Sequence, residues 1–402
     1  RLTDVTGVQT CALPIWIIVD LGHGLEDRTL ESRITVFDGN KIQGYRHSTG
    51  FIRDQHIYFY AEFSKPVRQT ISHIDGETGN TGEMTGGICK AALKFDISPG
   101  EEIIVKVALS YVSEEGAMKN LQAEVPHWNF DQVARQAKNA WESKLSKIEI
   151  SCNDHDQKTI FYTALYHTLI SPNLVSDSDG RYRGWDGQIR TNPENFYTNF
   201  SLWDTYRAVH PLLGLIFPEM NRRFIGSMLQ RYQEIGELPI NEYGMNETFS
   251  MIGHHSIPVM ADALVNSFCE FDTGLAFEAV RHSSTTDQFN FKADWEKYMR
   301  YGYLPADSIP AESVSRTLEF AYNDWCVAQM AKILGKTGDY EYFSKRAGFY
   351  KNLFDRETSL MRGRNSDGSW VVPFDPFKIS HASSGGGDYT EANAWQDRKS
   401  VV

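Results

Sequence analysis

The ten residues 103–112, IIVKVALSYV, are the last clearly strand-like stretch in the sequence and so mark where its fold class changes. They are rich in β-branched side chains, and shorter runs of the same kind occur upstream at 56–60 (HIYFY) and 90–95 (KAALKF). Turn-forming dipeptides, for example at 75–76, separate these runs. Strands at short intervals with turns between them are typical of an antiparallel sandwich. We therefore predict a β-sandwich, incomplete at its start, over residues 16–113.

The hydrophobic period changes after Ser113. Val133, Ala137, Trp141 and Leu145 recur every four residues and share one helical face, which predicts a helical linker over residues 114–150. Apolar stripes of helical period then dominate, as at 160–169, 314–328 and 343–354. Residues 151–396 are accordingly predicted to form a helical domain. Its long loops, rich in aromatic and acidic residues, are of a kind that is usually functional.

The composition excludes several classes of protein. Of 402 residues, 41% are hydrophobic and 13% aromatic, which is too much apolar material for a disordered chain, and no apolar run has the length of a membrane span. Lys and Arg number 40 against 52 Asp and Glu, a net charge of −12, so we expect no nucleic-acid partner. The five cysteines are widely spaced, which argues against a zinc or disulfide framework.

Both ends of the chain look foreign. The stretches QTCALPI (9–15) and DRKSVV (397–402) do not continue the patterns beside them. Codons for residues 12–15 can be the reverse complement of codons for residues 397–400, so both ends can derive from one DNA sequence, which resembles a short-read sequencing adapter. We therefore expect residues 1–15 and 397–402 to be artefactual and leave them out of the fold prediction. The remainder is then an internal fragment.

Four loop segments place carboxylates beside aromatic residues, at 200–207, 246–255, 303–307 and 388–396. Sugars offer hydroxyl groups to carboxylates and a C–H face to aromatic rings, so a carbohydrate pocket needs these residue types together. The sequence has no nucleotide-binding glycine loop, nucleophile elbow or HExxH motif that would favour another chemistry. The segments therefore suggest a carbohydrate site.

Each candidate residue also has a purely structural interpretation. Asp204 and Arg207 are three residues apart, so they could bind sugar hydroxyls or form an ion pair within one helix. Glu247 could line a pocket or be a first-turn carboxylate favoured by a helix dipole. Glu391 lies among aromatic residues that would keep a carboxyl group protonated, as a general acid requires, or it could be a buried structural residue.

Two adjacent histidines, His254 and His255, could suggest a metal site. Neighbouring residues on a helix point in different directions, so one ion would not bind both. We expect them to pack or to form hydrogen bonds instead.

Across residues 17–396 the sequence resembles glycoside hydrolase family 92, the calcium-dependent, inverting exo-α-mannosidases. The resemblance rests on five motifs in order along the chain: FYTALYHTLISPNLVSDSDGRYRG (161–184), FSLWDTYRAVHPLLGL (200–215), MNETFSMIGHHS (245–256), VSRTLEFAYNDWCVAQMAKILGK (314–336) and YTEANAWQ (389–396). It implies a β-sandwich, a helical linker and an (α/α)6 barrel, in the order predicted above.

The resemblance also implies roles for individual residues. Glu391 matches the catalytic acid of the family, with Ala392 where the family usually has glycine. Asp204 is implied to hold the terminal mannose of a glycan, with Trp203 and Arg207 shaping the same subsite, and Glu247 is a further substrate-binding candidate. The implied cofactor is Ca²⁺, bound to the 2- and 3-hydroxyls of the ring. The implied location is secreted, periplasmic or at the cell surface.

The resemblance further predicts which parts of the enzyme are missing. The family's general base lies in an Asp-rich motif well after the YTEGNAWQ motif, and nothing like it precedes Asp397. We therefore expect an incomplete barrel that carries the acid and part of the sugar subsite, lacks the base and most calcium ligands, and is inactive. Two alternatives stay open: an (α/α)6 glycoside phosphorylase, which needs a phosphate site, and a non-catalytic glycan-binding protein.

Overall fold

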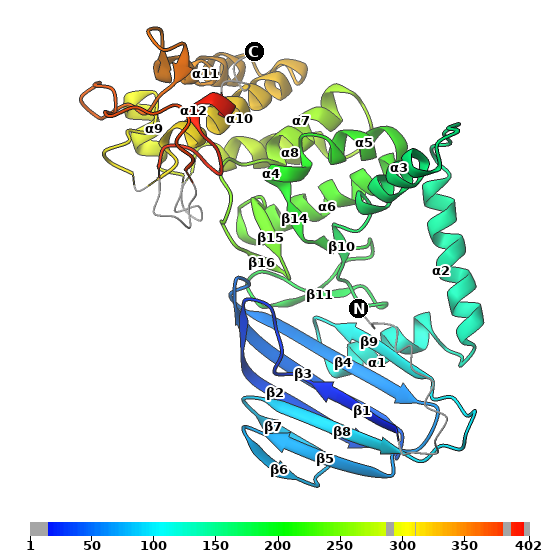
Figure 1. Cartoon of the computed structure of the whole chain (residues 1–402). Helices are drawn as coiled ribbons and strands as arrows, with labels where there is room; N and C mark the ends of the chain where they lie inside the picture. The colour runs from blue at the N-terminus through cyan, green and yellow to red at the C-terminus, as the bar shows by residue number, and fades with distance from the viewer. Residues whose placement is uncertain (1–14, 287–292, 310, 381–386, 398–402) are drawn as a thin grey trace. The chain divides into compact units, whose positions relative to one another are not determined.

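The computed structural model describes residues 15–286, 293–309, 311–380 and 387–397 (Figure 1). The chain divides into two compact units, which are described separately. The first comprises Arg1–Phe196 with Gly244–Asn246, and the second Tyr197–Tyr243 with Glu247–Val402. Most of the two terminal segments predicted to be foreign lies outside the described residues.

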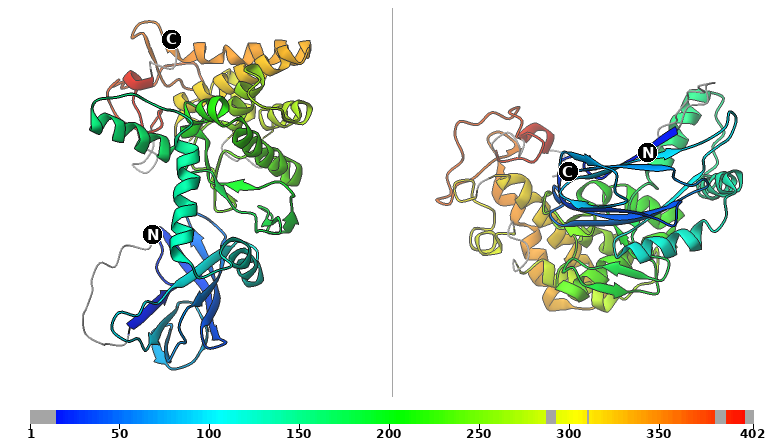
Figure 2. Two further views of the ribbon diagram at one scale, coloured as in Figure 1. Left: turned by 90° about the vertical axis from the view of Figure 1, so that its right-hand side faces the viewer. Right: turned by 90° about the horizontal axis from the view of Figure 1, so that it is seen from below.

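The N-terminal unit contains two antiparallel sheets, with strand orders β7-β2-β3-β4-β9 and β1-β8-β5-β6. They lie one over the other (Figures 1 and 2). The strands are β1 (Ile15–Asp20), β2 (Asp27–Phe37), β3 (Lys41–Gly50), β4 (Gln55–Phe63), β5 (Gln69–Ile74), β6 (Glu77–Gly79), β7 (Glu83–Gly86), β8 (Cys89–Phe95) and β9 (Val105–Ser110).

The core of this unit lies between the two sheets. Along β8, every second residue from Cys89 to Phe95 is buried, as expected for a strand with one face on the core. These side chains pack with Ile34 of β2, Ile42 of β3 and Phe63 of β4. The predicted β-sandwich is therefore confirmed.

Three helices follow the sandwich: α1 (Glu114–Glu124), α2 (Phe130–Leu145) and α3 (His155–His167). Helix α1 packs on strands β4 and β9, where the Asn120 side chain donates a hydrogen bond to the Leu109 carbonyl at 2.9 Å. Helix α2 coincides with the predicted linker stripe, although none of its residues is buried. Two short strands, β11 (Arg181–Arg183) and β12 (Ile189–Thr191), pair farther along this unit.

The second unit is mainly helical. Its helices are α4 (Leu202–Thr205), α5 (Val209–Ile216), α6 (Pro218–Ile235), α7 (Ser256–Val265), α8 (Thr273–Ser283), α9 (Trp295–Tyr301), α10 (Ser313–Ile333), α11 (Thr337–Ala347), the 3-10 helix η1 (Phe349–Leu353) and α12 (Ala394–Asp397). Its short strands include β14 (Phe200–Ser201), β15 (Asn241–Tyr243), β17 (Phe354–Asp355) and β18 (Leu360–Met361), and the division between the units falls within β16 (Asn246–Glu247). The long helix α10 packs against α7, α8 and α11. A β-rich domain is thus followed by a helical one, as predicted.

Some predicted stripes differ from the observed helices. The stripe over 343–354 does not form one helix, because α11 ends at Ala347 and the chain continues as a 3-10 turn and then as strand β17. In α10, Trp325 was expected in the core but is 52% exposed. In α3, Leu165 is the one buried residue. Within the described residues, no helix is both long and apolar enough to cross a membrane.

A buried ion pair joins helix α6 to strand β15. The Arg231 guanidinium donates a hydrogen bond from Nε to Oε2 of Glu242 at 3.0 Å, and neither side chain has any exposed area. The Thr198 hydroxyl donates to the same carboxylate. Because both side chains are buried, each charged group needs the other as its counter-ion. An unpaired charge in the interior is strongly destabilising.

We predict that Glu242→Ala lowers the free energy of unfolding by about 3–5 kcal/mol, because it removes the carboxylate that pairs with the buried Arg231 cation. Replacing both residues with apolar side chains, Arg231→Met with Glu242→Leu, should cost less than this single change. Asp186→Ala, which removes the exposed Arg190–Asp186 pair, should cost at most about 1 kcal/mol. Guanidinium unfolding followed by circular dichroism measures all three. Equal losses for Glu242→Ala and Asp186→Ala would contradict the prediction.

Candidate functional site

A cavity of about 920 Å³ in the helical unit brings together motifs that are far apart in the sequence. Its wall combines aromatic and ionisable side chains, among them Trp203, Tyr206, Arg207, Glu319, Tyr322, Trp325, Tyr350 and Glu391. Three predicted site residues, Trp203, Arg207 and Glu391, are therefore brought to one place. Asp204 and Glu247 are not among the lining residues.

Glu319 of helix α10 is the hydrogen-bonding centre of this cavity. Its carboxylate accepts hydrogen bonds from the Trp203 indole N–H and from Arg207, each at 3.2 Å. On its other oxygen, His255 Nε2 lies 3.2 Å away. Burial on its own would raise the pKa of Glu319, but His255, Arg207 and Trp203 hold that pKa below its usual value. Glu319 is therefore an anion that orients three other residues.

Aromatic rings provide the apolar part of the cavity wall. Tyr206 stacks on His255 with ring centroids 4.3 Å apart and an angle of 7° between the planes. Tyr322 and Trp325 lie nearly parallel, 6.2 Å apart, and the Trp325 ring is half exposed. Exposed aromatic faces beside charged groups can bind the C–H face and the hydroxyl groups of a sugar together.

The segment that carries Glu391 is fixed to the start of helix α10. The backbone N–H groups of Val314 and Ser315 donate to the Asp388 carbonyl at 2.9 and 3.2 Å. The Thr390 N–H in turn donates to Ser315 Oγ at 3.0 Å. The residue just before Glu391 is thus held by the same helix that carries Glu319.

Glu391 itself is exposed and lines the cavity. Its φ is +49°, a left-handed conformation that costs a residue with a side chain free energy and that is enriched at functional sites. Within the described residues the positive φ falls on Glu391 and not on Ala392, so this backbone does not need a glycine at 392. Asp397 also lines the cavity, but it belongs to the terminal segment predicted to be foreign.

Asp204 and Arg207 do not form the ion pair that was one interpretation of their spacing. Within the described chain, Arg207 pairs with Glu319 instead. The exposed Asp204 carboxylate accepts a hydrogen bond from the Ser201 hydroxyl at 2.5 Å. The spacing of three residues alone could not show that Arg207 reaches another helix.

Glu247 is buried and does not begin a helix, so its first-turn interpretation is wrong. It lies in strand β16, and its carboxylate accepts backbone hydrogen bonds from Ile240 and Phe249, both at 2.8 Å, and from Asn241 at 3.0 Å. Burial raises the pKa of Glu247 to about 7, while these backbone N–H groups act in the opposite direction. The residue thus ties the start of β15 to the segment that follows β16.

The two adjacent histidines have different partners, as predicted. His254 Nε2 lies 2.7 Å from Glu237 Oε1, whereas His255 faces Glu319. Glu319 was not among the predicted site residues, because hydrophobic period alone does not show which face of a helix lines a cavity. The available signal was a carboxylate directly beside the apolar 314–328 stripe.

Among the described residues of the helical unit, no three His, Cys, Asp or Glu side chains bring ligand atoms within 4.8 Å of one another. In the described part of the chain, three metal-competent ligand atoms come together at His47, Asp54 and His56, which belong to the N-terminal unit. Two of these ligands are imidazoles, whereas Ca²⁺ prefers carboxylate and carbonyl oxygens. This cluster therefore does not suit Ca²⁺, and the calcium implied by the resemblance stays a prediction.

Comparison with known proteins identifies both parts of the chain. The model of the glycosyl hydrolase family 92 N-terminal domain matches residues 10–110, and that of the family's catalytic domain matches residues 116–402. A family 92 α-mannosidase from Bacteroides thetaiotaomicron, solved in complex with mannoimidazole, is 37% identical with a TM-score of 0.91. The match covers 96% of this chain and 52% of that one.

Two further relatives agree with this result. A family 92 inverting mannosidase from the same bacterium is 29% identical, with a TM-score of 0.88, over 96% of this chain and 52% of its own. An uncharacterized secreted glycosidase from Arthroderma benhamiae is 28% identical over 292 residues, which are 68% of this chain and 33% of that protein. The chain thus spans about half the length of the solved relatives and a third of the fungal one.

The raised pKa of Glu247 predicts a pH dependence of stability. A carboxyl group whose pKa rises from 4.5 to about 7 on folding stabilises the folded state most below pH 4.5. This stabilisation is lost as the pH rises through 7. The side chain of Glu247→Gln stays neutral at all pH values. Relative to this variant, the free energy of unfolding of the wild type should fall by about 3 kcal/mol over this range. Urea unfolding at several pH values measures the difference.

The matched control for this experiment is Glu219→Gln, because the Glu219 side chain is 77% exposed. It should leave the pH profile of stability unchanged. A wild type that instead gains stability relative to Glu247→Gln as the pH rises would show that the backbone N–H groups outweigh burial, and would contradict the prediction.

Proposed function

The chain belongs to glycosyl hydrolase family 92, and on that premise we propose that it is part of an exo-acting enzyme that hydrolyses terminal α-mannosides of glycans with inversion. The observation that carries the proposal is the single cavity shared by Trp203, Arg207, Glu319 and Glu391. The solved relative with 37% identity was determined with mannoimidazole bound, which supports mannose as the sugar.

Glu391 is proposed as the general acid, which donates a proton to the glycosidic oxygen as the bond to the leaving group breaks. Its exposure to the cavity allows contact with a substrate, and its strained backbone is fixed by the start of α10 through Thr390 and Asp388. A fixed position matters because proton transfer requires the acid within hydrogen-bonding distance of the departing oxygen.

Trp203 and Arg207 are proposed to bind the terminal sugar. Glu319 holds both side chains, so they face the cavity in a defined geometry before substrate arrives. The exposed Asp204 remains a proposed mannose contact next to Trp203. Glu247 is proposed to support the site indirectly, since its carboxylate accepts hydrogen bonds from backbone N–H groups.

An inverting glycosidase needs a second carboxylate about 6.5–9.5 Å from the acid to activate water. Glu319 is poorly suited to this task because Arg207, Trp203 and His255 occupy its oxygens. We propose that the base and most calcium ligands lie in sequence outside this chain, which is half as long as its solved relatives. The 402-residue chain should then make only part of the contacts to the sugar and should not hydrolyse an α-mannoside. The secreted fungal relative supports export as a further proposal.

The cavity favours hydrolysis over phosphorolysis. A phosphorylase needs basic residues for a second anion, whereas Arg207 is the one Lys or Arg among the described lining residues. Arg207 already forms an ion pair with Glu319, with its Nη2 3.2 Å from the Glu319 Oε1. A glycan-binding protein without turnover remains the alternative that an activity measurement decides.

We predict that Glu391→Gln, made in a protein extended to the full length of its relatives, lowers kcat on an α-mannoside by roughly 10²- to 10⁴-fold, because the general acid is lost. The control Glu341→Gln, at an exposed position on α11, should keep wild-type activity. Mannose release is measured directly. The 402-residue chain should release none, and turnover by that chain or full activity of Glu391→Gln would contradict the proposal.

We also predict that Trp325→Ala weakens binding of mannoimidazole to the extended protein by about tenfold, or about 1.4 kcal/mol, because the cavity loses an exposed aromatic face. Isothermal titration calorimetry measures the dissociation constant. Trp141→Ala removes a tryptophan of helix α2 and serves as the matched control. Equal affinities for the two variants would show that Trp325 does not contact the sugar.

A further inference from the structure

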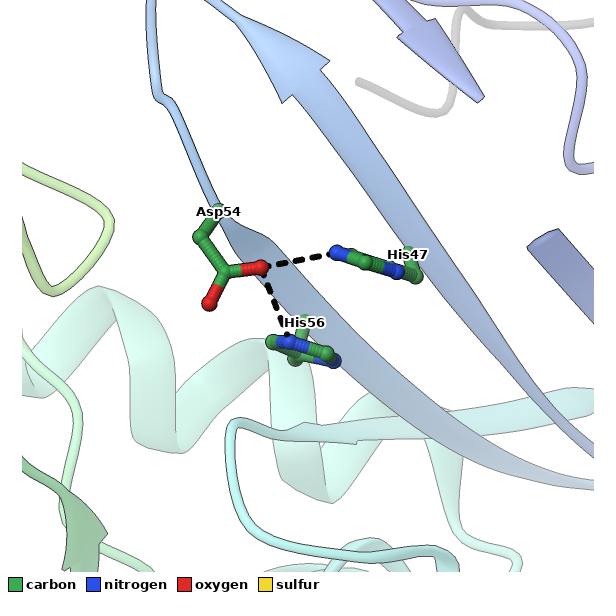
Figure 3. Close-up of side chains that lie close together, drawn as sticks. All are labelled: His47, Asp54 and His56. Carbon is green, nitrogen blue, oxygen red and sulfur yellow. Dashed lines mark hydrogen bonds and ion pairs between the residues drawn. The ribbon is translucent and has the colours of Figure 1, made fainter. Parts of the chain in front are cut away.

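The hairpin formed by strands β3 and β4 brings two histidines and an aspartate together (Figure 3). His47 on β3 and His56 on β4 are direct partners in the antiparallel register, so their side chains lie on the same face. Asp54 precedes His56 by two residues, which places it on that face as well. Its Oδ1 lies 2.7 Å from His47 Nε2 and 3.1 Å from His56 Nε2.

The local packing determines which atoms are available to bind an ion. The two imidazole rings stack with centroids 4.2 Å apart and an angle of 10° between them, so both present Nε2 in the same direction. Nδ1 of His56 is buried without a hydrogen-bonding partner and points away from Asp54. The Asp54 side chain is 61% exposed, so an ion could enter from solvent.

The spacing of these atoms fits a small tetrahedral site. The three ligand atoms all lie within 4.8 Å of one another. Around an ion with bonds of about 2.0–2.1 Å, neighbouring ligands of a tetrahedron are about 3.3 Å apart, which is close to the two distances observed here. A small outward movement of the side chains would admit an ion.

The aspartate is held in place by a residue far away in the sequence. Asn246 accepts a hydrogen bond from the Asp54 N–H at 3.2 Å and donates one to the Asp54 carbonyl at 2.9 Å. Gly244–Asn246 belongs to the same compact unit as the hairpin. This support fixes the backbone of the carboxylate ligand, as outer partners of metal ligands commonly do.

Among the described residues, Arg183 also acts electrostatically on His56, besides Asp54 and His47. Its guanidinium donates to the carbonyls of Tyr111 and Gly187 at 3.0 and 3.1 Å, so it is directed to the backbone. The Tyr45 ring stacks over His56 at 6.1 Å and completes one side of the cluster. The cluster therefore presents two imidazoles and one carboxylate to solvent.

We propose that His47, Asp54 and His56 form a binding site for a divalent transition-metal ion of the Zn²⁺ type. Imidazole nitrogens favour Zn²⁺, Ni²⁺ or Cu²⁺ over Ca²⁺ or Mg²⁺, which prefer oxygen ligands. Three protein ligands leave a fourth position for water or another ligand. The ion would cross-link β3 and β4 next to their connecting loop, and the site is independent of the cavity in the helical unit.

The test is a titration of the 402-residue chain, freed of metal with a chelator, with Zn²⁺ alone by isothermal titration calorimetry. The wild type should bind one equivalent of Zn²⁺. His47→Gln and His56→Gln should each lower the affinity for Zn²⁺ at least tenfold, since losing even an outer partner of a metal ligand costs roughly that much affinity. A hundredfold excess of Ca²⁺ should not compete. The control His73→Gln, a histidine of β5 that hydrogen-bonds Thr78, should bind as the wild type does.

Thermal unfolding provides a second measurement and shows whether the variants fold. Saturating Zn²⁺ should raise the Tm of the wild type and of His73→Gln, but not that of His56→Gln, because an ion that binds only the folded state stabilises it. The proposal is overturned if the wild type shows no saturable Zn²⁺ binding. It is equally overturned if both His variants bind Zn²⁺ like the wild type, in which case the cluster is only a hydrogen-bonded Asp–His group.

Discussion

The carboxylate of Glu319 is the constraint on which the cavity depends. It is 15% exposed, and its two oxygens are shared by Trp203, Arg207 and His255. A largely buried anion that loses its partners is destabilising by several kcal/mol, so these side chains cannot leave it without a cost. The start of α7, the α4 segment and α10 are therefore held in one arrangement by an electrostatic requirement.

Helix α10 also fixes the segment that carries Glu391. Its first N–H groups donate to the Asp388 carbonyl, and Ser315 Oγ accepts from the Thr390 N–H, which holds Glu391 in the cavity that Trp203 and Arg207 also line. The proposed acid and the proposed sugar-binding residues are thus positioned by one helix. This matters for catalysis, because small displacements of reacting groups cost a large part of the rate.

Much of the fold followed from hydrophobic period, because burial requires alternation in the strands and a period near 3.6 in helices such as α10. Acidic and aromatic residues concentrated in loops predicted a carbohydrate pocket, but the assignment of Trp203 and Arg207 to one subsite came from the resemblance. The roles of Glu319 and Trp325 were not predictable, because a helix face that lines a cavity has the same period as one that packs in a core. The structural role of Glu247 was not predictable either, because its donors Ile240 and Asn241 lie at the start of β15, and sequence period does not show which side chain caps a strand start.

The central claim is that the cavity around Glu319 holds the terminal mannose. The most direct test is a crystal structure, with mannoimidazole, of a protein that extends this chain to the length of its solved relatives. The ligand should lie between Trp203 and Glu391, with its hydroxyl groups in contact with the side chains that Glu319 orients. Mannoimidazole bound elsewhere, with this cavity empty, would contradict the account.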